Sequence, residues 1–255
     1  MTDLHHYPLE VDRVGTVIVD FRDHSGLLWL QHLIGDELAA YDIERGLFRA
    51  LSRFLREDHV FWDVGANAGT VSAYVAKTFP KVKIFAFEPN PSIFSSLATL
   101  FSKVERVRVY PFALSHEDTT VMLTIPKGKS VGGSIEGIEY VLKTSSLTEE
   151  DVEQVTVKAF KGDSLLRSEA SLLPPHVIKL DVEGHEPSAL AGFAEIIRQH
   201  HPVIFFEHLY LSDPDVAKVV PEGYSIHSVD NITGELTPAF DRSVGHNSVL
   251  VPLRG

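Results

Sequence analysis

A strand, a loop and a helix follow one another in the stretch Phe61-Trp62-Asp63-Val64-Gly65-Ala66-Asn67-Ala68-Gly69-Thr70. Residues 60–62 are β-branched or aromatic and suit a buried strand, and Gly65 and Gly69 permit a tight turn close to a ligand. Apolar residues recur at helical spacing over 69–79, which predicts a helix whose free N–H groups face that ligand. This order of elements is typical of a nucleotide-cofactor loop.

The composition indicates one large α/β domain, because 255 residues with 44% hydrophobic content can form a substantial core. The formal net charge is −12, from 35 acidic and 23 basic residues, which argues against nucleic acid as a partner. The chain has no cysteine, so disulfides, thiolate zinc sites and cysteine nucleophiles are excluded. We therefore expect a small-molecule ligand.

The start of the chain lacks the basic and apolar regions of a signal peptide, and no apolar run is long enough to span a membrane. We therefore expect a cytoplasmic protein without a membrane partner. The oligomeric state is left open by the sequence, a homodimer included.

Two extended segments near the N-terminus, 16–21 and 27–32, are joined by residues 22–26 and predict a hairpin. We assign residues 1–42 to this hairpin or cap segment and residues 43–255 to the main domain. That domain begins with a predicted helix, in which an apolar stripe is formed by Leu47, Leu51, Phe54 and Leu55.

Short apolar strands then alternate with amphipathic helices. The predicted strands are 83–88, 106–111, 177–180 and 203–206, followed by two antiparallel edge strands at 224–229 and 248–252. One helix is predicted to start at Asn90-Pro91, and another carries Leu190, Phe193, Ala194 and Ile197. The pattern predicts a doubly wound, mostly parallel seven-stranded sheet.

An insertion interrupts this alternation, because extended runs at 119–125 and 155–160 flank a Gly/Ser/Lys-rich stretch at 127–134. We predict an inserted hairpin. Its tip is either a solvated loop or a lid over the substrate, and the sequence leaves both open.

Acidic residues close four of the predicted strands. Asp63 and Glu88 follow the first two, Asp181 with Glu183 follows the fourth, and Glu207 with His208 follows the fifth. Taken alone, each of these residues is more simply interpreted as a helix cap or a surface charge. Ligands of parallel sheets sit beyond the carboxyl ends of the strands. Acidic residues at four such strand ends therefore indicate a binding site.

The spacing within this site favours S-adenosylmethionine as the cofactor. Glu88 lies 23 residues after Gly65, where an acid can accept hydrogen bonds from ribose hydroxyls. The loop has the form Gly-x-x-x-Gly and follows Asp63, whose charge repels a diphosphate but suits an ammonium and a sulfonium. We expect the amino-acid end at Asp63 and the loop amides, and the adenine at 112–114. The predicted cofactor residues are Asp63, Gly65, Ala66, Asn67, Gly69, Glu88, Pro89, Ala113, Leu114 and Asp181.

Three segments resemble the FkbM-type S-adenosylmethionine-dependent methyltransferases: residues 62–69, Phe87-Glu88-Pro89-Asn90-Pro91, and Ile178-Lys179-Leu180-Asp181-Val182-Glu183-Gly184-His185-Glu186. The resemblance covers roughly residues 45–210 and is weaker to about 252. It implies a class I, Rossmann-like methyltransferase domain over 43–255. The implied activity is O-methylation of a hydroxyl on a sugar, glycolipid or polyketide-like natural product. Phe160-Lys161-Gly162-Asp163-Ser164 stands where the family has a Leu-Asp pair.

An alcohol acceptor needs a base within hydrogen-bond reach, and the candidates are Asp181, Glu183 and His185. Histidine has an unperturbed pKa near neutrality, but His185 also suits a helix N-terminus. As an alternative, Asp181, Glu207 and His208 could hold a divalent metal that lowers the pKa of the acceptor hydroxyl.

Two other functions are compatible with the predicted sheet. A nicotinamide-dependent oxidoreductase shares the acidic ribose contact, but its Gly-x-Gly-x-x-Gly fingerprint is missing. A non-catalytic nucleotide-binding module would keep the fold without turnover. The intact Asp63, Gly65, Gly69, Glu88 and Asp181 argue against such decay.

Overall fold

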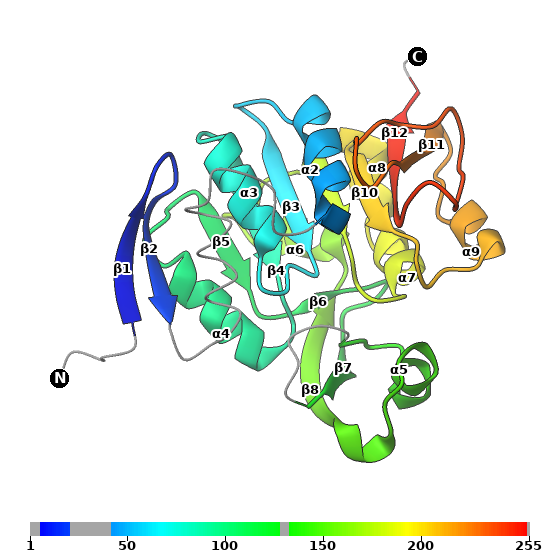
Figure 1. The fold of residues 1–255 in the computed structure, drawn as a ribbon, viewed down its shortest axis with the longest axis horizontal. Helices are drawn as coiled ribbons and strands as arrows, with labels where there is room; N and C mark the ends of the chain where they lie inside the picture. Colours follow the sequence, from blue (N-terminus) through cyan, green and yellow to red (C-terminus); the bar gives the residue numbers. More distant parts are fainter. Residues whose placement is uncertain (1–5, 21–41, 128–132, 254–255) are drawn as a thin grey trace.

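The computed structural model describes residues 6–20, 42–127 and 133–253. Within them, a seven-stranded sheet has the strand order β11-β12-β10-β9-β3-β4-β5 (Figure 1). Its strands are β3 (Val60–Val64), β4 (Lys83–Phe87), β5 (Val107–Tyr110), β9 (Val177–Leu180), β10 (Val203–Glu207), β11 (Tyr224–Val229) and β12 (Asn247–Pro252). The pairs from β5 to β10 are parallel, and β12 is antiparallel to both β10 and β11. The predicted α/β class is confirmed, and the reversed β12 makes the sheet mixed.

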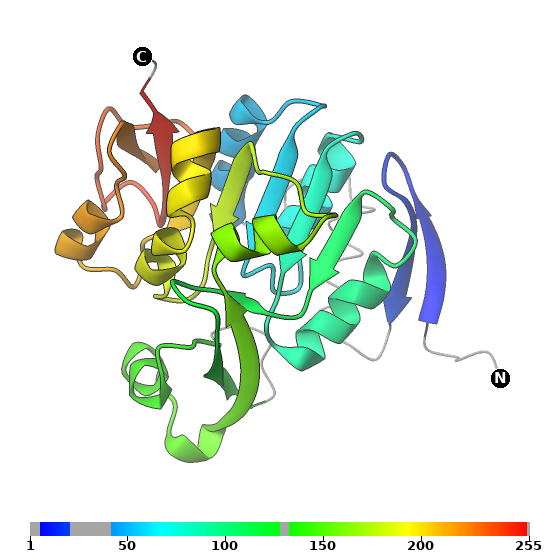
Figure 2. The same ribbon diagram turned by 180° about the vertical axis from the view of Figure 1, so that it is seen from behind.

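Helices cover both faces of this sheet, as the two opposite views show (Figures 1 and 2). One face packs against α2 (Asp42–Phe54), α3 (Thr70–Thr78) and α4 (Pro91–Leu100). The other packs against α6 (Gly162–Ser168), α7 (Glu186–Ala191), α8 (Ala194–His200) and α9 (Asp213–Lys218). Because side chains alternate along a strand, Phe61 of β3 enters the first core and Trp62 enters the second.

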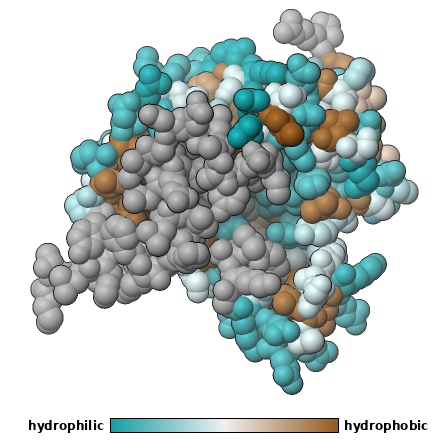
Figure 3. All heavy atoms as spheres, in the orientation of Figure 1, coloured by the Kyte–Doolittle hydropathy of each residue, from teal (hydrophilic) through white to brown (hydrophobic). Residues whose placement is uncertain are grey.

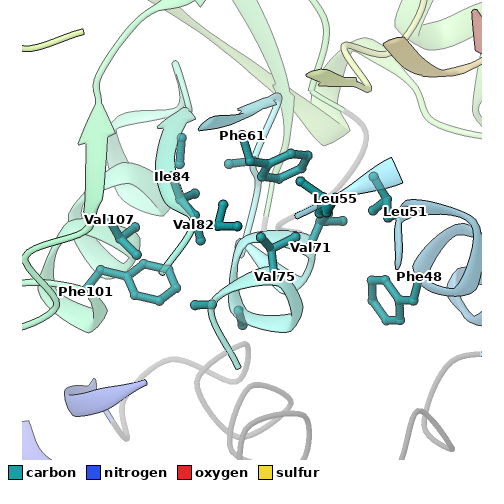
Figure 4. Close-up of a cluster of buried hydrophobic side chains, with 14 of the residues drawn as sticks. Phe48, Leu51, Leu55, Phe61, Val71, Val75, Val82, Ile84, Phe101 and Val107 are labelled. Carbon is teal, nitrogen blue, oxygen red and sulfur yellow. The ribbon is translucent and has the colours of Figure 1, made fainter. Parts of the chain in front are cut away.

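The first core explains why the apolar stripe of the first helix could be predicted from the sequence. Leu51 and Leu55 of the segment that contains α2 are fully buried beside Phe61, with Val71 and Val75 of α3 in the same cluster (Figure 4). Burying a leucine side chain contributes about 1.5–3 kcal/mol. The predicted apolar stripe of this helix therefore faces the core.

The described N-terminal segment is a separate hairpin of β1 (His6–Val11) and β2 (Gly15–Asp20). The predicted strand 16–21 corresponds to β2, but its described partner precedes it in the chain, and residues 27–32 lie outside the described residues. The reversal is made by Arg13 and Gly15, which have φ values of 63° and 99°. Val17 and Val19 then enter the first core.

The insertion follows β6 (Ala113–Leu114) and projects from one end of the main sheet (Figures 1 and 2). Its elements are β7 (Thr119–Pro126), α5 (Ile138–Thr144), the 3₁₀ turn η1 (Glu149–Asp151) and β8 (Val152–Phe160). The described strands form a three-stranded sheet of order β6-β8-β7, with β7 and β8 antiparallel. The predicted hairpin is confirmed, and α5 was not predicted.

The helix predicted through 190–197 is two helices, α7 and α8, which meet at Gly192. A Cβ atom at Gly192 would lie 2.0 Å from the carbonyl oxygen of Ser115, so the backbones touch there. The carboxylate of Asp163 accepts hydrogen bonds from the amides of Glu195 and Ile196, both at 3.0 Å, and so starts α8 separately. The segment that departs from the family pattern therefore has a structural role here.

The described helices include none that is long and apolar enough to cross a membrane. In the space-filling view, hydrophobic side chains form small patches among hydrophilic ones where grey atoms do not cover the surface (Figure 3).

Candidate active site

The glycine loop is held between its two neighbouring strands. Gly65 has a φ of 74°, and a Cβ atom there would lie 1.8 Å from the carbonyl oxygen of Asp181. The amides of Gly65 and Ala66 both donate to the carbonyl of Phe87 at 3.0 Å. This close approach requires glycine and fixes the loop at the carboxyl ends of β3, β4 and β9.

The remaining loop amides also have partners within the protein. Asn67, with a φ of 49°, donates its amide to Oε2 of Glu88 at 2.7 Å. The amide of Ala68 donates to Oδ1 of Asn67 at 2.6 Å, and that of Gly69 donates to the carbonyl of Ala66 at 2.6 Å. The loop amides that were expected to hold the cofactor are thus engaged internally.

Asp63 lies beneath the loop and is fully buried. Its Oδ2 accepts a hydrogen bond from the hydroxyl of Ser72 at 2.6 Å, and its Oδ1 lies 3.9 Å from Nζ of Lys179. Burial raises the pKa of Asp63, and the charge of Lys179 opposes the rise. Lys179 also donates to Oδ2 of Asp181 at 2.9 Å and to the carbonyl of Gly65 at 3.3 Å. One lysine therefore bridges two carboxylates and the loop.

Glu88 closes β4 and is held by two backbone amides. Its Oε2 accepts from Asn67, and its Oε1 accepts from Asn90 at 2.8 Å. Burial raises the pKa of Glu88 to about 7, and these two amide bonds act against the rise. The predicted helix start at Asn90 is confirmed, because its Oδ1 accepts from the amide of Ser92 at 3.1 Å.

A pocket lies at this edge of the sheet, with Glu88 and Asp181 in its wall. Its lining residues are Val64, Gly65, Asn67, Phe87, Glu88, Pro89, Asn90, Ile93, Phe112, Ala113, Leu114, Leu123, Ile125, Gly133, Ile135, Asp181, Val182, Glu183 and His185. The predicted cofactor residues in this wall are Gly65, Asn67, Glu88, Pro89, Ala113, Leu114 and Asp181. The other three do not line the pocket: Ala66 and Gly69 belong to the loop, and Asp63 lies beneath it.

The turn after β9 has an unusual backbone. Glu183 and Gly184 have φ values of 53° and 95°, so two consecutive residues adopt left-handed conformations. A Cβ atom at Gly184 would lie 2.0 Å from the hydroxyl oxygen of Tyr140, which belongs to α5. The insertion thus covers this turn directly.

His185 is bonded at both ring nitrogens. Its Nδ1 lies 2.5 Å from Oε1 of Glu136, and its Nε2 lies 2.9 Å from the hydroxyl oxygen of Ser115. The residue is 7% exposed. A direct contact between His185 and an acceptor hydroxyl would therefore require one of these bonds to break.

Other carboxyl groups in this region favour their protonated forms. Burial raises the pKa of Glu186 to about 8, and its Oε1 accepts from the amide of Val182 at 2.9 Å. Burial, followed by repulsion from Asp181 and Glu183, raises the pKa of Glu207 to about 9. The strand ends thus form an acidic but partly neutralised region.

The predicted metal group is not formed. Among the described residues, no three His, Asp or Glu side chains are placed to hold a metal ion. His208 is 1% exposed, its Nδ1 lies 3.0 Å from the hydroxyl of Ser248, and its ring meets Phe240 edge-on. Burial and the charge of Arg242 lower the pKa of His208 to about 4. This histidine belongs to the β10–β12 contact.

The sequence reasoning missed several residues of the site. Lys179 could have been found, because it lies two positions before Asp181 on a strand and so shares its side of the sheet. Glu136 and Ser115 carry no comparable signal, because only the folded insertion brings them to His185.

Comparison with known proteins agrees with this geometry. Residues 63–236 match the methyltransferase FkbM domain. The chain belongs to the FkbM methyltransferase family. It is thus a methyltransferase of the S-adenosylmethionine-dependent class with a Rossmann-like fold, as the resemblance implied.

This FkbM-family chain is similar to two curated methyltransferases and to one solved structure. It is 30% identical over 185 residues to the hexuronic acid methyltransferase AglP of Haloferax volcanii, covering 70% of this chain and 68% of that protein. It is 25% identical over 205 residues to the 31-O-demethyl-FK506 methyltransferase FkbM of Streptomyces tacrolimicus, covering 71% and 70%. The crystal structure of methyltransferase FkbM from Methylobacillus flagellatus has a TM-score of 0.51 at 15% identity, covering 89% of this chain and 55% of that one. That structural likeness supports the fold.

Proposed function

We propose that this protein transfers the methyl group of S-adenosylmethionine to a hydroxyl group of a sugar or a sugar-like acceptor. The observation that carries the proposal is the position of Glu88, in the pocket wall beside the glycine loop. A carboxylate has about four acceptor sites, and the amides of Asn67 and Asn90 occupy two. The remaining sites suit the two hydroxyls of a ribose.

The rest of the pocket fits the same cofactor. Phe112, Ala113 and Leu114 line the pocket and offer an apolar surface that would suit adenine. Because the loop amides are engaged, an ammonium group is better served by backbone carbonyl oxygens and by the negative charge of Asp63 below them. Asp63 is fully buried and outside the pocket wall, so it would act on the ammonium through its charge and not through a direct contact.

Asp181 is the base that this geometry favours. When bound, S-adenosylmethionine supplies an electrophilic methyl group on a sulfonium, so the acceptor hydroxyl needs alignment and a proton acceptor. Asp181 lines the pocket, its side chain is 30% exposed, and Lys179 donates to its Oδ2 at 2.9 Å. His185 is engaged at both ring nitrogens and takes a positioning role instead. Asp181 would accept the hydroxyl proton as the acceptor oxygen takes the methyl group, whose bond to sulfur breaks and leaves S-adenosylhomocysteine.

A sugar acceptor is favoured by two aromatic side chains near the turn after β9, where the hydroxyl of Tyr140 lies against Gly184. Tyr140 and Tyr210 are ring neighbours, with centroids 6.4 Å apart in an edge-to-face arrangement. Burial, followed by the charges of Glu183 and Glu207, raises the pKa of Tyr210. Aromatic rings with carboxylates around them suit the apolar faces and hydroxyls of a sugar better than an extended apolar chain.

Two binding measurements test the cofactor part of the proposal. S-adenosylhomocysteine should raise the melting temperature, whereas NAD should not, and the reverse result would favour an oxidoreductase. Glu88→Ala should weaken S-adenosylhomocysteine binding by about tenfold or more, because it removes charge-assisted hydrogen bonds. An unchanged dissociation constant in calorimetry would refute the ribose contact.

Turnover separates an enzyme from a non-catalytic module. Single-turnover transfer of a labelled methyl group to neutral sugars should occur with the wild-type protein and be lost in Asp181→Asn, while cofactor binding is largely kept. Loss of binding together with turnover would make Asp181 a cofactor ligand rather than the base.

A further inference from the structure

The insertion is joined to the turn after β9 by two hydrogen bonds. The hydroxyl of Ser134 donates to the carbonyl of Glu183 at 2.8 Å, and Glu136 bonds Nδ1 of His185 at 2.5 Å. These bonds hold a turn in which Glu183 adopts a left-handed conformation, which costs free energy for a residue with a side chain and persists only where neighbouring contacts fix it. Both anchors come from one short segment of the insertion, residues 133–137.

Ile135 lies between the two anchors in the sequence and lines the cofactor pocket. It packs with Leu123 and Ile125 of β7, which line the same pocket. Ser134 is also paired with Thr124, whose amide and carbonyl it bonds at 3.0 Å each. The anchors therefore hold an apolar wall of the insertion against the place of the cofactor.

The hydrogen bonds at His185 favour one tautomer of its ring. An ionised carboxylate only accepts hydrogen bonds, so the bond to Glu136 is made when Nδ1 of His185 carries the hydrogen. In the Nδ1–H tautomer, Nε2 is left to accept a hydrogen bond from the hydroxyl of Ser115. Ser115 directly follows Leu114 of the pocket wall. The two hydrogen bonds of His185 therefore connect the insertion, the turn after β9 and the segment after β6.

We infer that Glu136 is a positioning residue that acts through His185: it fixes the imidazole as the Nδ1–H tautomer and thereby closes the wall formed by Leu123, Ile125 and Ile135 over the bound cofactor. The inference rests on the proposed cofactor site. It adds a role for the insertion, whose hydrogen bonds to the core set how tightly the cofactor is enclosed.

Substitution of Glu136 tests this role. Glu136→Ala should weaken S-adenosylhomocysteine binding by about tenfold, because the charge-assisted bond to His185 is lost. Glu136→Gln should recover part of the affinity, since its amide oxygen still accepts from Nδ1. Glu139→Ala is the matched control, an exposed glutamate three residues later on the same insertion, and should bind like the wild type.

Nitrogen-15 NMR of the histidine rings reads the tautomer directly. His185, assigned by its loss in His185→Gln, should show the Nδ1–H form in the wild type and in Glu136→Gln, and should lose it in Glu136→Ala. A lower melting temperature with an unchanged tautomer would make Glu136 a merely structural residue and would overturn the inference.

The binding data separate this inference from the proposed function. If the wild type does not bind S-adenosylhomocysteine, the proposed function fails. If the wild type binds and Glu136→Ala binds equally well, only the role of Glu136 is overturned.

Discussion

Nζ of Lys179 lies 2.9 Å from Oδ2 of Asp181, at the end of the strand that follows the insertion. The same Nζ lies 3.9 Å from Oδ1 of the fully buried Asp63. Removing one partner of a buried ion pair leaves an uncompensated charge, which costs about 3–5 kcal/mol. This lysine therefore neutralises the floor of the site.

Lys179→Met should accordingly lower the free energy of unfolding by about 3 kcal/mol at pH 7. Its pKa-lowering charge is lost from Asp63, so the pKa of that buried carboxyl rises further and the variant loses stability as pH rises. Urea unfolding between pH 5 and pH 8 measures this difference. Lys158→Met, at an exposed position on β8, is the control and should change stability little. Equal losses in both variants would show that Lys179 has no special role.

Cofactor affinity should depend on the ionisation of Glu88. Burial raises the pKa of Glu88 to about 7, and ribose hydroxyls bind the ionised form better. The association constant for S-adenosylhomocysteine should therefore rise with pH through about 7, with proton release near that pH. Calorimetry in buffers of different ionisation enthalpy measures the released proton. In Glu88→Gln this proton release should vanish, and its persistence would assign the titration to another group.

The fold was predictable where local patterns and burial agree. The apolar stripe of Leu47, Leu51 and Leu55 and the strand Val60–Val64 follow directly from periodicity, because both elements have continuous buried faces. The break at Gly192 was not predictable. It depends on a backbone contact with Ser115, more than 70 positions earlier in the chain, and glycine in a helix pattern does not reveal such a contact.

Some residues of the site could also be predicted from the sequence, and others could not. Glu88 and Asp181 were predicted because strand ends meet at one edge of the sheet, and both line the pocket. The metal grouping of Asp181 with His208 failed because His208 pairs with Ser248 of the reversed strand β12. The position of a residue along its strand places it at one edge of the sheet, but it does not determine which neighbouring side chain it contacts.

Gly65→Ala should be among the most damaging single substitutions in the loop. The added Cβ would lie 1.8 Å from the carbonyl oxygen of Asp181, and the φ of 74° is itself unfavourable for alanine. We expect a loss of more than about 2 kcal/mol and no measurable cofactor binding. Gly223→Ala separates the two causes, because Gly223 has a φ of 80° with no atom within 4 Å of the added Cβ. A similar loss in both variants would assign the effect to φ alone.

Glu207→Gln should be more stable than the wild type at high pH. Burial, with repulsion from Asp181 and Glu183, raises the pKa of Glu207 to about 9, whereas an unfolded glutamate has a pKa of about 4.3. Between these values the folded state binds more protons than the unfolded state, so the wild type loses stability with rising pH, and this loss begins near pH 4.3. Glutamine does not titrate, so the variant should gain about 1–3 kcal/mol over the wild type at pH 8 and nothing at pH 4. Chemical denaturation at the two pH values measures the difference, with the exposed Glu222→Gln as the control. A pH-independent gain would point to packing rather than ionisation, and a loss at pH 8 would mean that Glu207 is ionised and engaged in the folded protein.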